Sequence, residues 1–423
     1  MLASRRYLGD LRQFGPNVAR YLVAIALVGF AVDGGVYAAL LNLFLARVGY
    51  GPEQIGLVNA VGALVFASAS LPAGVLGGRL GSRRVILVGL GLLAACGTLL
   101  PLADTLPPAA RMPWLLSMIT GLYLGLALYF VNAAPILLAL VRSDQRNQAY
   151  STQTALISLS AFLGSLAGGL LPLLIGGMIG VSLDDPAPYR YGLMAAGLAI
   201  APALLAIRQI PLADLRDTPD TPAPVAGAAP AISAATPILG LLSLIALVRV
   251  LQVAGLAATS TFANLYLDTA LHVPTAQIGL VLALGRLAGV PAALITAPLS
   301  ARFGNRNVVI GATLATGVGM LPITFIPHWG AAALSLMAVF SLSAIRYAAS
   351  MVYFLDLVPP SRRAVVVGVT EMAAGVCFTG LTFGGGYIIA LFGYQALFLL
   401  GAALSALSAL VFWAAFRRRE AAT

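Results

Sequence analysis

Long apolar stretches separated by short polar segments make up most of this chain. A helix pairs its own backbone amides, and about 20 apolar residues cross the hydrocarbon core of a bilayer. The pattern predicts an all-α integral membrane protein with twelve transmembrane helices. We expect the helices at residues 19–46, 53–77, 84–104, 113–141, 149–179, 190–208, 238–267, 275–300, 307–327, 329–357, 365–391 and 394–416.

The overall composition supports a membrane protein and excludes an ordinary soluble domain. Apolar residues make up 60% of the chain, charged residues make up 9%, and the mean hydropathy is +0.96. A soluble domain carries about a quarter charged residues. The main partner of this surface is therefore expected to be the lipid bilayer.

The basic residues, all arginine, predict the orientation in the membrane. If the N-terminus is cytoplasmic, 18 of the 24 fall at cytoplasmic ends and loops, whereas Arg47, Arg111 and Arg190 fall outside. This imbalance follows the positive-inside rule, so we expect both termini to be cytoplasmic. It also explains the net charge of +10, and because the arginines are spread over separate loops we expect no nucleic-acid binding.

The sequence repeats itself at an offset of about 223 residues. The segment from Gly74 to Leu87 returns from Ala297 to Ile310, and Asn42 with its neighbours returns at Asn264. Residues 209–236 are rich in Pro, Ala and Asp and read as a flexible cytoplasmic linker. We therefore predict two pseudo-symmetric six-helix bundles, residues 1–208 and 237–423, with the working site between them.

The repeated loop resembles the signature G-x-L-x-D-R-x-G-R-R of the major facilitator superfamily. The matching residues are Gly74, Leu76, Arg79, Gly81, Arg83 and Arg84, and the second copy keeps Arg302, Gly304 and Arg306. In the family, the motif aspartate joins arginines and a helix N-terminus across the two halves and favours the outward-open state. Here Gly78 and Ala301 replace it. The resemblance implies a transporter that works by alternating access, but without the aspartate of this contact between the halves. The arginines can then bind the C-terminal carbonyls of a neighbouring helix.

A second motif bears on the direction of transport. Residues Gly164–Gly169 are similar to the G-P-x-x-G-G motif of the family's antiporters, with Ser165 at the proline position and an echo at Gly380–Gly385. Small residues at this spacing also serve close helix packing. The fourth span has Gly121 near the position of the arginine found in drug/proton antiporters, which weakens the drug-exporter interpretation.

Five charged residues fall in the interior of the predicted spans, away from the span ends, where each charge costs roughly 2.5 to 3.5 kcal/mol. They are Asp33, Arg249, Arg286, Arg346 and Glu371. In the fold that the chain resembles, their spans line or flank the central cavity. Helical spacing adds polar neighbours, so the candidate substrate-binding set is Arg249, Gln252, Arg286, Arg346, Ser350, Tyr353, Tyr37, Tyr129 and Asn132.

Three arginines favour an anionic or zwitterionic substrate, because guanidinium groups bind carboxylates and phosphates at two points. The alternative is internal pairing, with Asp33 joined to Arg346 or Arg249 and Glu371 to a remaining arginine. Asp33 is the first candidate proton carrier, since separation from an arginine would change its proton affinity. A gating ion pair is the alternative role. Glu371 is the second candidate, and its depth also suits Arg362 or Arg363.

These features together predict a monomeric, bacterial inner-membrane transporter and no enzyme. We expect proton-coupled efflux of a small amphipathic or anionic solute. Uptake of an organic anion or sugar-like solute with protons is the near alternative, and a lipid-handling relative is a third. No cofactor or metal is expected, because Cys96, Cys377, His272 and His328 show no ligand spacing.

Overall fold

The computed structural model describes residues 15–142, 146–211, 236–359 and 363–416, and in these ranges the regular structure is helical. The predicted linker and both chain ends lie almost wholly outside the described residues. The helices are α2 (Pro16–Ala31), α3 (Val36–Arg47), α4 (Pro52–Leu80), α5 (Ser82–Leu99), the 3-10 helix η1 (Leu100–Thr105), α6 (Pro108–Leu140), α7 (Arg146–Ile179), α8 (Ala187–Leu198), α9 (Ala201–Arg208), α10 (Thr236–Thr269), α11 (Thr275–Phe303), α12 (Asn305–Gly319), α13 (Leu321–Phe325), α14 (Trp329–Asp356) and α15 (Arg363–Phe416).

The described residues contain eleven helical segments long and apolar enough to cross a membrane. One of them, at the end of the chain, accounts for two predicted spans. α15 has 54 residues, about 80 Å at 1.5 Å per residue, which is far longer than a bilayer is thick. Its backbone leaves the helical conformation at Gly393, where φ is 81°. A turn at Gly393 divides α15 into two spans and agrees with the predicted twelve.

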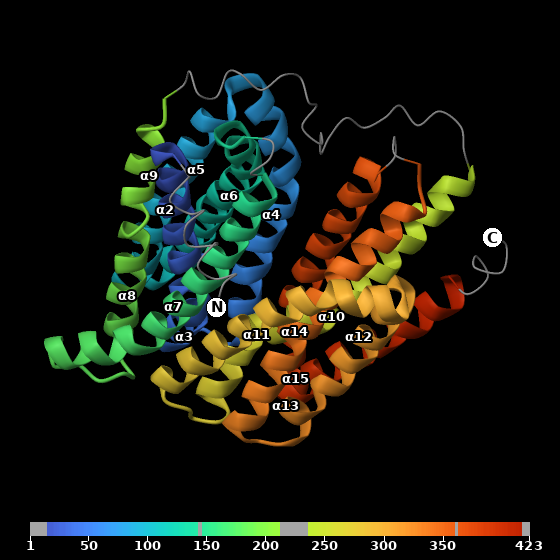
Figure 1. Ribbon diagram of the computed structural model, residues 1–423. Coiled ribbons are helices and arrows are strands. Elements are labelled where there is room, and N and C mark those ends of the chain that lie inside the picture. The colour runs from blue at the N-terminus through green and yellow to red at the C-terminus, as the bar shows by residue number, and fades with distance from the viewer. Residues whose placement is uncertain (1–14, 143–145, 212–235, 360–362, 417–423) are drawn as a thin grey trace, which may run out of the picture.

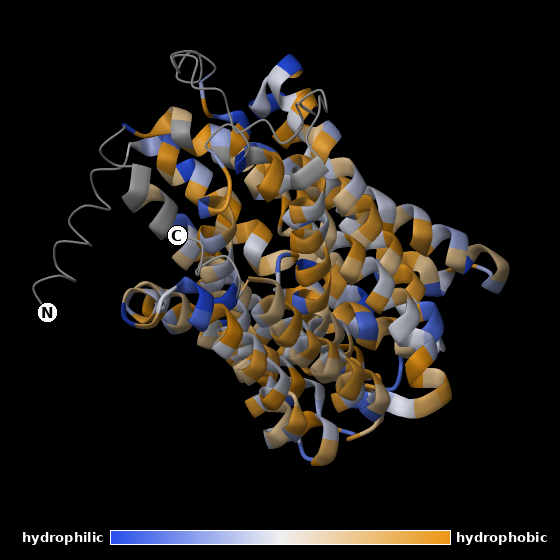
Figure 2. Ribbon diagram, turned by 90° about the vertical axis from the view of Figure 1, so that its right-hand side faces the viewer, coloured by the Kyte–Doolittle hydropathy of each residue, from blue (hydrophilic) through white to orange (hydrophobic). Residues whose placement is uncertain are grey.

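The helices form two groups that meet at one end and stand apart at the other (Figure 1). The first group contains α2–α9 and the second contains α10–α15. We call the membrane side that carries the Gly81 and Gly304 turns the Gly81 side, and the opposite one the Arg47 side. The groups touch on the Arg47 side and diverge toward the Gly81 side. Figure 2 shows that apolar residues dominate the helices, with hydrophilic residues gathered near their ends.

The repeated sequence folds into repeated geometry. Gly81 separates α4 from α5 with φ 87° and ψ 129°, and Gly304 separates α11 from α12 with φ 78° and ψ 147°. Both conformations lie in the region that disfavours side chains, which explains the two glycines. The two turns therefore have the same backbone conformation.

The arginines of the repeated loops bind within their own bundles. Arg83 donates to the carbonyl of Ile207 at 3.4 Å and to that of Arg208, at the end of α9. Its counterpart Arg306 donates to the carbonyl of Trp413 at 3.4 Å, near the end of α15. Each arginine thus satisfies C-terminal carbonyls of a neighbouring helix, where a cation also interacts favourably with the helix dipole.

We expect Arg83→Ala to lower the free energy of unfolding by about 1 kcal/mol, because exposed C-terminal carbonyls lose their donor. Thermal melting of the detergent-solubilised protein measures this. The neighbouring Arg84 is exposed, and its side chain makes no hydrogen bond or ion pair with a described residue. Arg84→Ala is the matched control, and equal losses in both variants would contradict the capping role.

The contact between the bundles is pseudo-twofold. The Asn42 amide donates to the Thr261 carbonyl at 2.6 Å and to the Asn264 amide oxygen at 3.1 Å. In return, the Asn264 amide donates to the carbonyls of Ala38 and Ala39. Equivalent asparagines therefore reach equivalent carbonyls across the seam, as two halves of a repeated unit should.

Glycines bring the bundles together on either side of this contact. A Cβ on Gly279 of α11 would lie 2.5 Å from the Gly169 Cα of α7, and a Cβ on Gly56 of α4 would lie 2.5 Å from the Thr382 carbonyl oxygen of α15. Both approaches leave no room for a side chain. Gly169 of the antiporter-like motif therefore serves as a packing surface in this state.

Candidate functional site

A break in the first span places Asp33 in the middle of the membrane. The α2 helix ends at Ala31 and α3 begins at Val36. The amide of Asp33 donates to the Val28 carbonyl, five residues back, and Gly34 has φ 82°. The Ser165 hydroxyl of α7 donates to the Gly34 carbonyl at 2.7 Å and satisfies one broken backbone group. Interrupted helices of this kind form ion and substrate sites in transporters.

Arg286 of α11 is the cation beside this break. A Cβ on Gly34 would lie 3.0 Å from the Arg286 Cζ, so the guanidinium rests against the backbone next to Asp33. Arg286 also stacks 4.6 Å from the centre of the Phe340 ring. The Asp33 carboxylate interacts electrostatically with Arg286, but no ion pair within 4.0 Å joins it to a described residue. The alternative pairing of Asp33 with Arg249 or Arg346 is therefore replaced by an interaction with Arg286.

A second charged group lies inside the C-terminal bundle. Arg346 of α14 donates to the backbone carbonyl of Gln252 in α10 and, at 3.3 Å, to the Ser343 hydroxyl. Arg249 of α10 lies over the Tyr347 ring, 5.0 Å from its centre. The Tyr347 hydroxyl donates to the Glu371 carboxylate of α15 at 3.1 Å. We call Arg249, Gln252, Arg346, Tyr347 and Glu371 the arginine layer.

Three members of the arginine layer are buried with incomplete hydrogen bonding. The exposed fractions are 6% for Arg249, 0% for Gln252 and 1% for Arg346. The Nε atoms of both arginines and both side-chain amide atoms of Gln252 have no hydrogen-bond partner among the described residues. A buried polar atom without a partner costs about 1 to 3 kcal/mol. The donors outnumber the acceptors here, so the layer fits an anionic group.

The two charged groups lie at different depths. Seventeen residues separate Asp33 from Pro16 at the start of α2, and 17 separate Arg286 from Phe303 at the end of α11. Arg346 is 10 residues from Asp356, the end of α14 on the same Gly81 side. At 1.5 Å per residue, the Asp33–Arg286 pair lies on the order of 10 Å deeper than the arginine layer.

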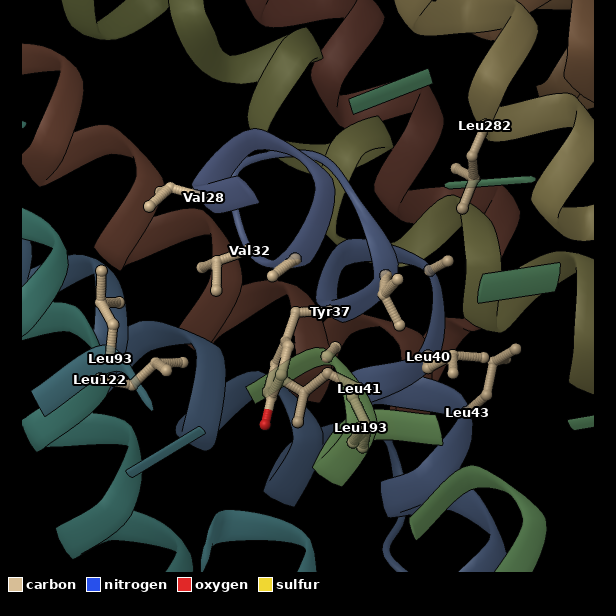
Figure 3. Close-up of a cluster of buried hydrophobic side chains, with 14 of the residues drawn as sticks. Val28, Val32, Tyr37, Leu40, Leu41, Leu43, Leu93, Leu122, Leu193 and Leu282 are labelled. Carbon is tan, nitrogen blue, oxygen red and sulfur yellow. The ribbon is translucent and has the colours of Figure 1, made fainter. Parts of the chain in front are cut away.

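Tyr37 does not join the site. Its hydroxyl donates to the Gly97 carbonyl, and the side chain is 3% exposed among apolar residues of the N-terminal bundle. Figure 3 shows it within this apolar cluster, near Leu41 and Leu193. A tyrosine one turn from a membrane carboxylate can point toward the site or into its own bundle. Here the backbone break changes the direction of α3, and Tyr37 points into its own bundle.

The other polar candidates divide between helix packing and the site. The Asn132 amide donates to the Ala73 and Leu128 carbonyls, and Ser350 donates to the Tyr347 carbonyl within its own helix. Tyr353 packs on Phe412 and Phe416. Asn132, Ser350 and Tyr353 therefore stabilise helix contacts, because hydrogen bonds occupy the side-chain donors of Asn132 and Ser350 and the Tyr353 ring packs on neighbouring rings.

Span 4 does contribute aromatic groups to the Asp33 side. Tyr129, expected from the sequence, is 4% exposed and interacts electrostatically with Asp33. Tyr123 of the same helix does so too and was missed, as was Tyr347. Tyr347 directly follows Arg346, and tyrosine spacing alone does not distinguish a ring that stacks on an arginine from one in the core.

Glu371 faces α10 and α14 and not the loop arginines. Its charge acts on Arg249, and its hydrogen bond comes from Tyr347. Arg363 instead donates to the Leu355 carbonyl at 3.3 Å, and Arg362 lies outside the described residues. Among the described residues, no cluster of three or more His, Cys, Asp or Glu side chains could hold a metal ion.

Two repeated bundles that span the membrane around buried charges define a membrane transporter. The sequence profile of the Major Facilitator Superfamily matches residues 22–247 and, a second time, residues 245–423. The chain belongs to this superfamily and is a transporter, not an enzyme. The double match agrees with the repeat seen in the sequence.

Solved structures of transporters share the fold. A point mutant of the nucleoside transporter NupG matches with a TM-score of 0.71 at 16% identity, covering 95% of this chain and 100% of that one. The xylose transporter XylE from E. coli, in an inward-open conformation, matches with a TM-score of 0.70 at 14% identity, covering 94% and 95%. A bacterial homolog of the human lysosomal transporter Spinster, inward-facing and unoccupied, gives 0.69 at 16%, covering 95% and 98%. A search of curated protein sequences gave no match.

Proposed function

We propose that this chain is a proton-coupled transporter of a small organic anion, in which the two bundles alternate around the arginine layer. The observation that carries the proposal is the set of buried, unpartnered donors on Arg249, Gln252 and Arg346. A ligand that accepts hydrogen bonds from these donors would recover several kcal/mol. Guanidinium donors favour a carboxylate or phosphate over a neutral hydroxyl group.

The surroundings of the layer favour an amphipathic anion. Val253, Ala254, Ala374 and Cys377 form a buried apolar cluster on the same helices, next to the two arginines. The Gln252 amide oxygen also lacks a donor. A carboxylate on an apolar or hydroxylated carbon skeleton suits both features, since binding sites combine apolar walls with a few placed polar groups.

The charge distribution of the loops gives this state a direction. If the Gly81 side is cytoplasmic, as the arginine bias indicates, the bundles are closed toward the outside and separated toward the cytoplasm. The structure then corresponds to an inward-facing state. An anion held by the arginine layer would leave to the cytoplasm.

Asp33 is the proposed proton carrier because its main electrostatic partner belongs to the other bundle. Arg286 lies on α11, whereas Asp33 and the nearby Tyr123 and Tyr129 lie in the N-terminal bundle. A nearby cation stabilises an ionised carboxylate, and an apolar setting without the cation stabilises the protonated form. Separation of α11 from α3 would then load a proton, and their approach in this state would release it.

Two separate sites favour transport of anion and proton in the same direction. The arginine layer and Asp33 share no residue and lie on the order of 10 Å apart in depth, so both can be occupied at once. An exchanger in which proton and substrate compete needs a shared site. The Gly164–Gly169 motif gives only weak support to efflux, because close packing accounts for its glycines here. We therefore favour uptake, the second direction considered from the sequence.

The test uses purified protein in proteoliposomes with an imposed pH gradient. A panel of butyrate, gluconate and benzoate is first screened by thermal shift, because a ligand selective for the folded protein raises its melting temperature. Radiolabelled gluconate, which does not cross lipid unaided, then reports accumulation. For Asp33→Asn we expect accumulation driven by the gradient to fall at least tenfold while exchange of internal for external gluconate continues.

Glu53→Gln serves as the matched control, because Glu53 is a carboxylate in the first turn of α4 on the Arg47 side, away from both charged groups. It should keep both accumulation and exchange. Unchanged accumulation in Asp33→Asn would contradict the coupling role. Accumulation of gluconate inside vesicles whose interior is more acidic than the outside would contradict uptake together with protons and favour exchange. Absence of any stabilising anion would contradict the proposed substrate class.

A further inference from the structure

Glu371 lies one helical turn from a contact between α15 and the N-terminal bundle. One turn further along α15, a Cβ on Gly375 would lie 2.7 Å from Ala67 of α4, and Gly386 continues the same contact at Pro52 and Glu53. Residues four apart share a helix face. Glu371 itself is exposed.

A short chain of contacts links Glu371 to the anion site. The carboxylate accepts a hydrogen bond from the Tyr347 hydroxyl at 3.1 Å. The guanidinium of Arg249 lies over the face of the Tyr347 ring, 5.0 Å from the ring centre. The charges of Glu371 and Arg249 attract each other, and Arg249 in turn repels Arg346. Glu371 therefore neutralises one of the two arginines without occupying the unpartnered Nε atoms.

No other described carboxylate of the C-terminal bundle reaches this layer. Asp268 pairs with Arg47 on the opposite side of the membrane, at 2.6 Å. Asp356 is the last residue of α14, ten residues or about 15 Å along the helix from Arg346. Asp33 lies deeper, beside Arg286. The arginine layer consequently holds two positive charges and one negative charge.

We propose that Glu371 sets the charge of the substrate, so that the site selects a monoanion over a dianion of the same carbon skeleton. This inference rests on the proposed function, because it concerns the same anion site. One bound negative charge makes the layer neutral. A second negative charge would have no remaining positive charge to pair with and would face Glu371, and like charges at close range repel.

The experiment compares matched pairs of ligands on the full chain in detergent. Butyrate and succinate share a four-carbon skeleton, and gluconate and glucarate share a six-carbon skeleton. Apparent dissociation constants come from thermal-shift titrations at constant ionic strength. We expect the wild type to bind each monoanion at least tenfold more tightly than its dianion, and Glu371→Gln to shift this ratio at least tenfold toward the dianion.

Two further variants separate charge from structure. Tyr347→Phe keeps the ring under Arg249 and removes only the hydroxyl, so the selectivity should stay within about threefold of wild type, because the charges are unchanged. Glu371→Ser repeats the neutralisation with a smaller side chain at an exposed position. It should give the same shift as Glu371→Gln, and it decides the question if the glutamine variant does not fold.

The possible failures are distinguishable. Arg346→Gln should weaken every anion at least tenfold, and undiminished binding in this variant would overturn the proposed anion site itself. If Arg346→Gln loses binding but both Glu371 variants keep the wild-type ratio, the anion site stands and the charge-setting role of Glu371 is overturned. A wild type that prefers dianions also overturns that role.

Discussion

Asp268→Asn should move the protein out of the state described here and toward one in which the Arg47 side is open. The Asp268 carboxylate of α10 accepts two hydrogen bonds from Arg47 of α3, at 2.6 and 2.8 Å. The two side chains are 5% and 20% exposed. Arg47 also donates to the Leu183 carbonyl at 3.0 Å, which orients the guanidinium. This ion pair joins the two bundles and must break when their ends separate.

The expected shift is large because the pair is mostly shielded from water. Removing one partner of a buried ion pair costs about 3 to 5 kcal/mol, since the remaining charge stays unpaired. In the state with an open Arg47 side, Arg47 is hydrated, so the substitution of Asp268 does not destabilise that state. Allowing for the partial exposure of Arg47, we expect about 3 kcal/mol, or roughly a hundredfold change in the equilibrium between the two states.

Distances between spin labels measure this equilibrium. Cysteines at Asp184 and Gln277 report the Arg47 side, and cysteines at Leu80 and Phe303 report the Gly81 side, all four positions being exposed. The native Cys96 and Cys377 are replaced in this background. In Asp268→Asn the first distance should lengthen and the second should shorten.

The N-terminal bundle supplies a matched control. Arg190 pairs with Asp104 at 2.8 Å, with exposed fractions of 18% and 8%, but both residues belong to the same bundle. Asp104→Asn should lower the melting temperature and leave both distance distributions unchanged. An unaltered distribution in Asp268→Asn, or the same change in both variants, would show that Arg47–Asp268 does not hold the bundles together.

Gly279→Val should block closure of the Arg47 side altogether. Even a Cβ at Gly279 would lie 2.5 Å from the Gly169 Cα and 2.7 Å from the Ser165 carbonyl oxygen. These are backbone atoms, so no change of side-chain rotamer relieves the overlap. Overpacking in a close-packed contact costs about 1 to 3 kcal/mol per site and more against backbone. We expect the state closed on the Arg47 side and steady-state transport to be lost, while the protein still folds with the Arg47 side open.

Gly177→Val is the matched control, because a Cβ at Gly177 of α7 has no neighbour within 4 Å. The same spin-label pairs and the gluconate assay apply to both variants. Transport at the wild-type rate in Gly279→Val would mean that α7 and α11 do not need this close approach during the cycle.

The missing motif acid and the Arg47–Asp268 pair together account for the state that the bundles adopt. Gly78 is exposed, with nothing within 4 Å of a Cβ, and Ala301 is also exposed. No carboxylate at these positions can draw the Gly81 ends together. On the opposite side, an ion pair and reciprocal asparagine bonds join the bundles. The balance of cross-bundle contacts therefore lies on the Arg47 side.

The sequence by itself determined the number of spans, the duplication and the family. These properties follow from local physics, because a helix in lipid must be apolar over its length and a repeated loop keeps the glycines that its backbone requires. The predicted span boundaries lie within a few residues of the observed helices, and the turn at Gly393 supplies the twelfth. The sequence also singled out the five membrane charges that the structure places in the two groups.

Only the tertiary structure decided which charges meet and what the polar neighbours do. Asp33 approaches Arg286 because the break at Gly34 admits a guanidinium from the other bundle. Tyr37, one turn on, turns into its own bundle, whereas Tyr347, which no periodicity singled out, carries Arg249. Pairing across bundles depends on helix rotation and on the docking of segments far apart in sequence. Hydrophobic periodicity constrains neither of these, because both faces of a span in such a bundle can be apolar.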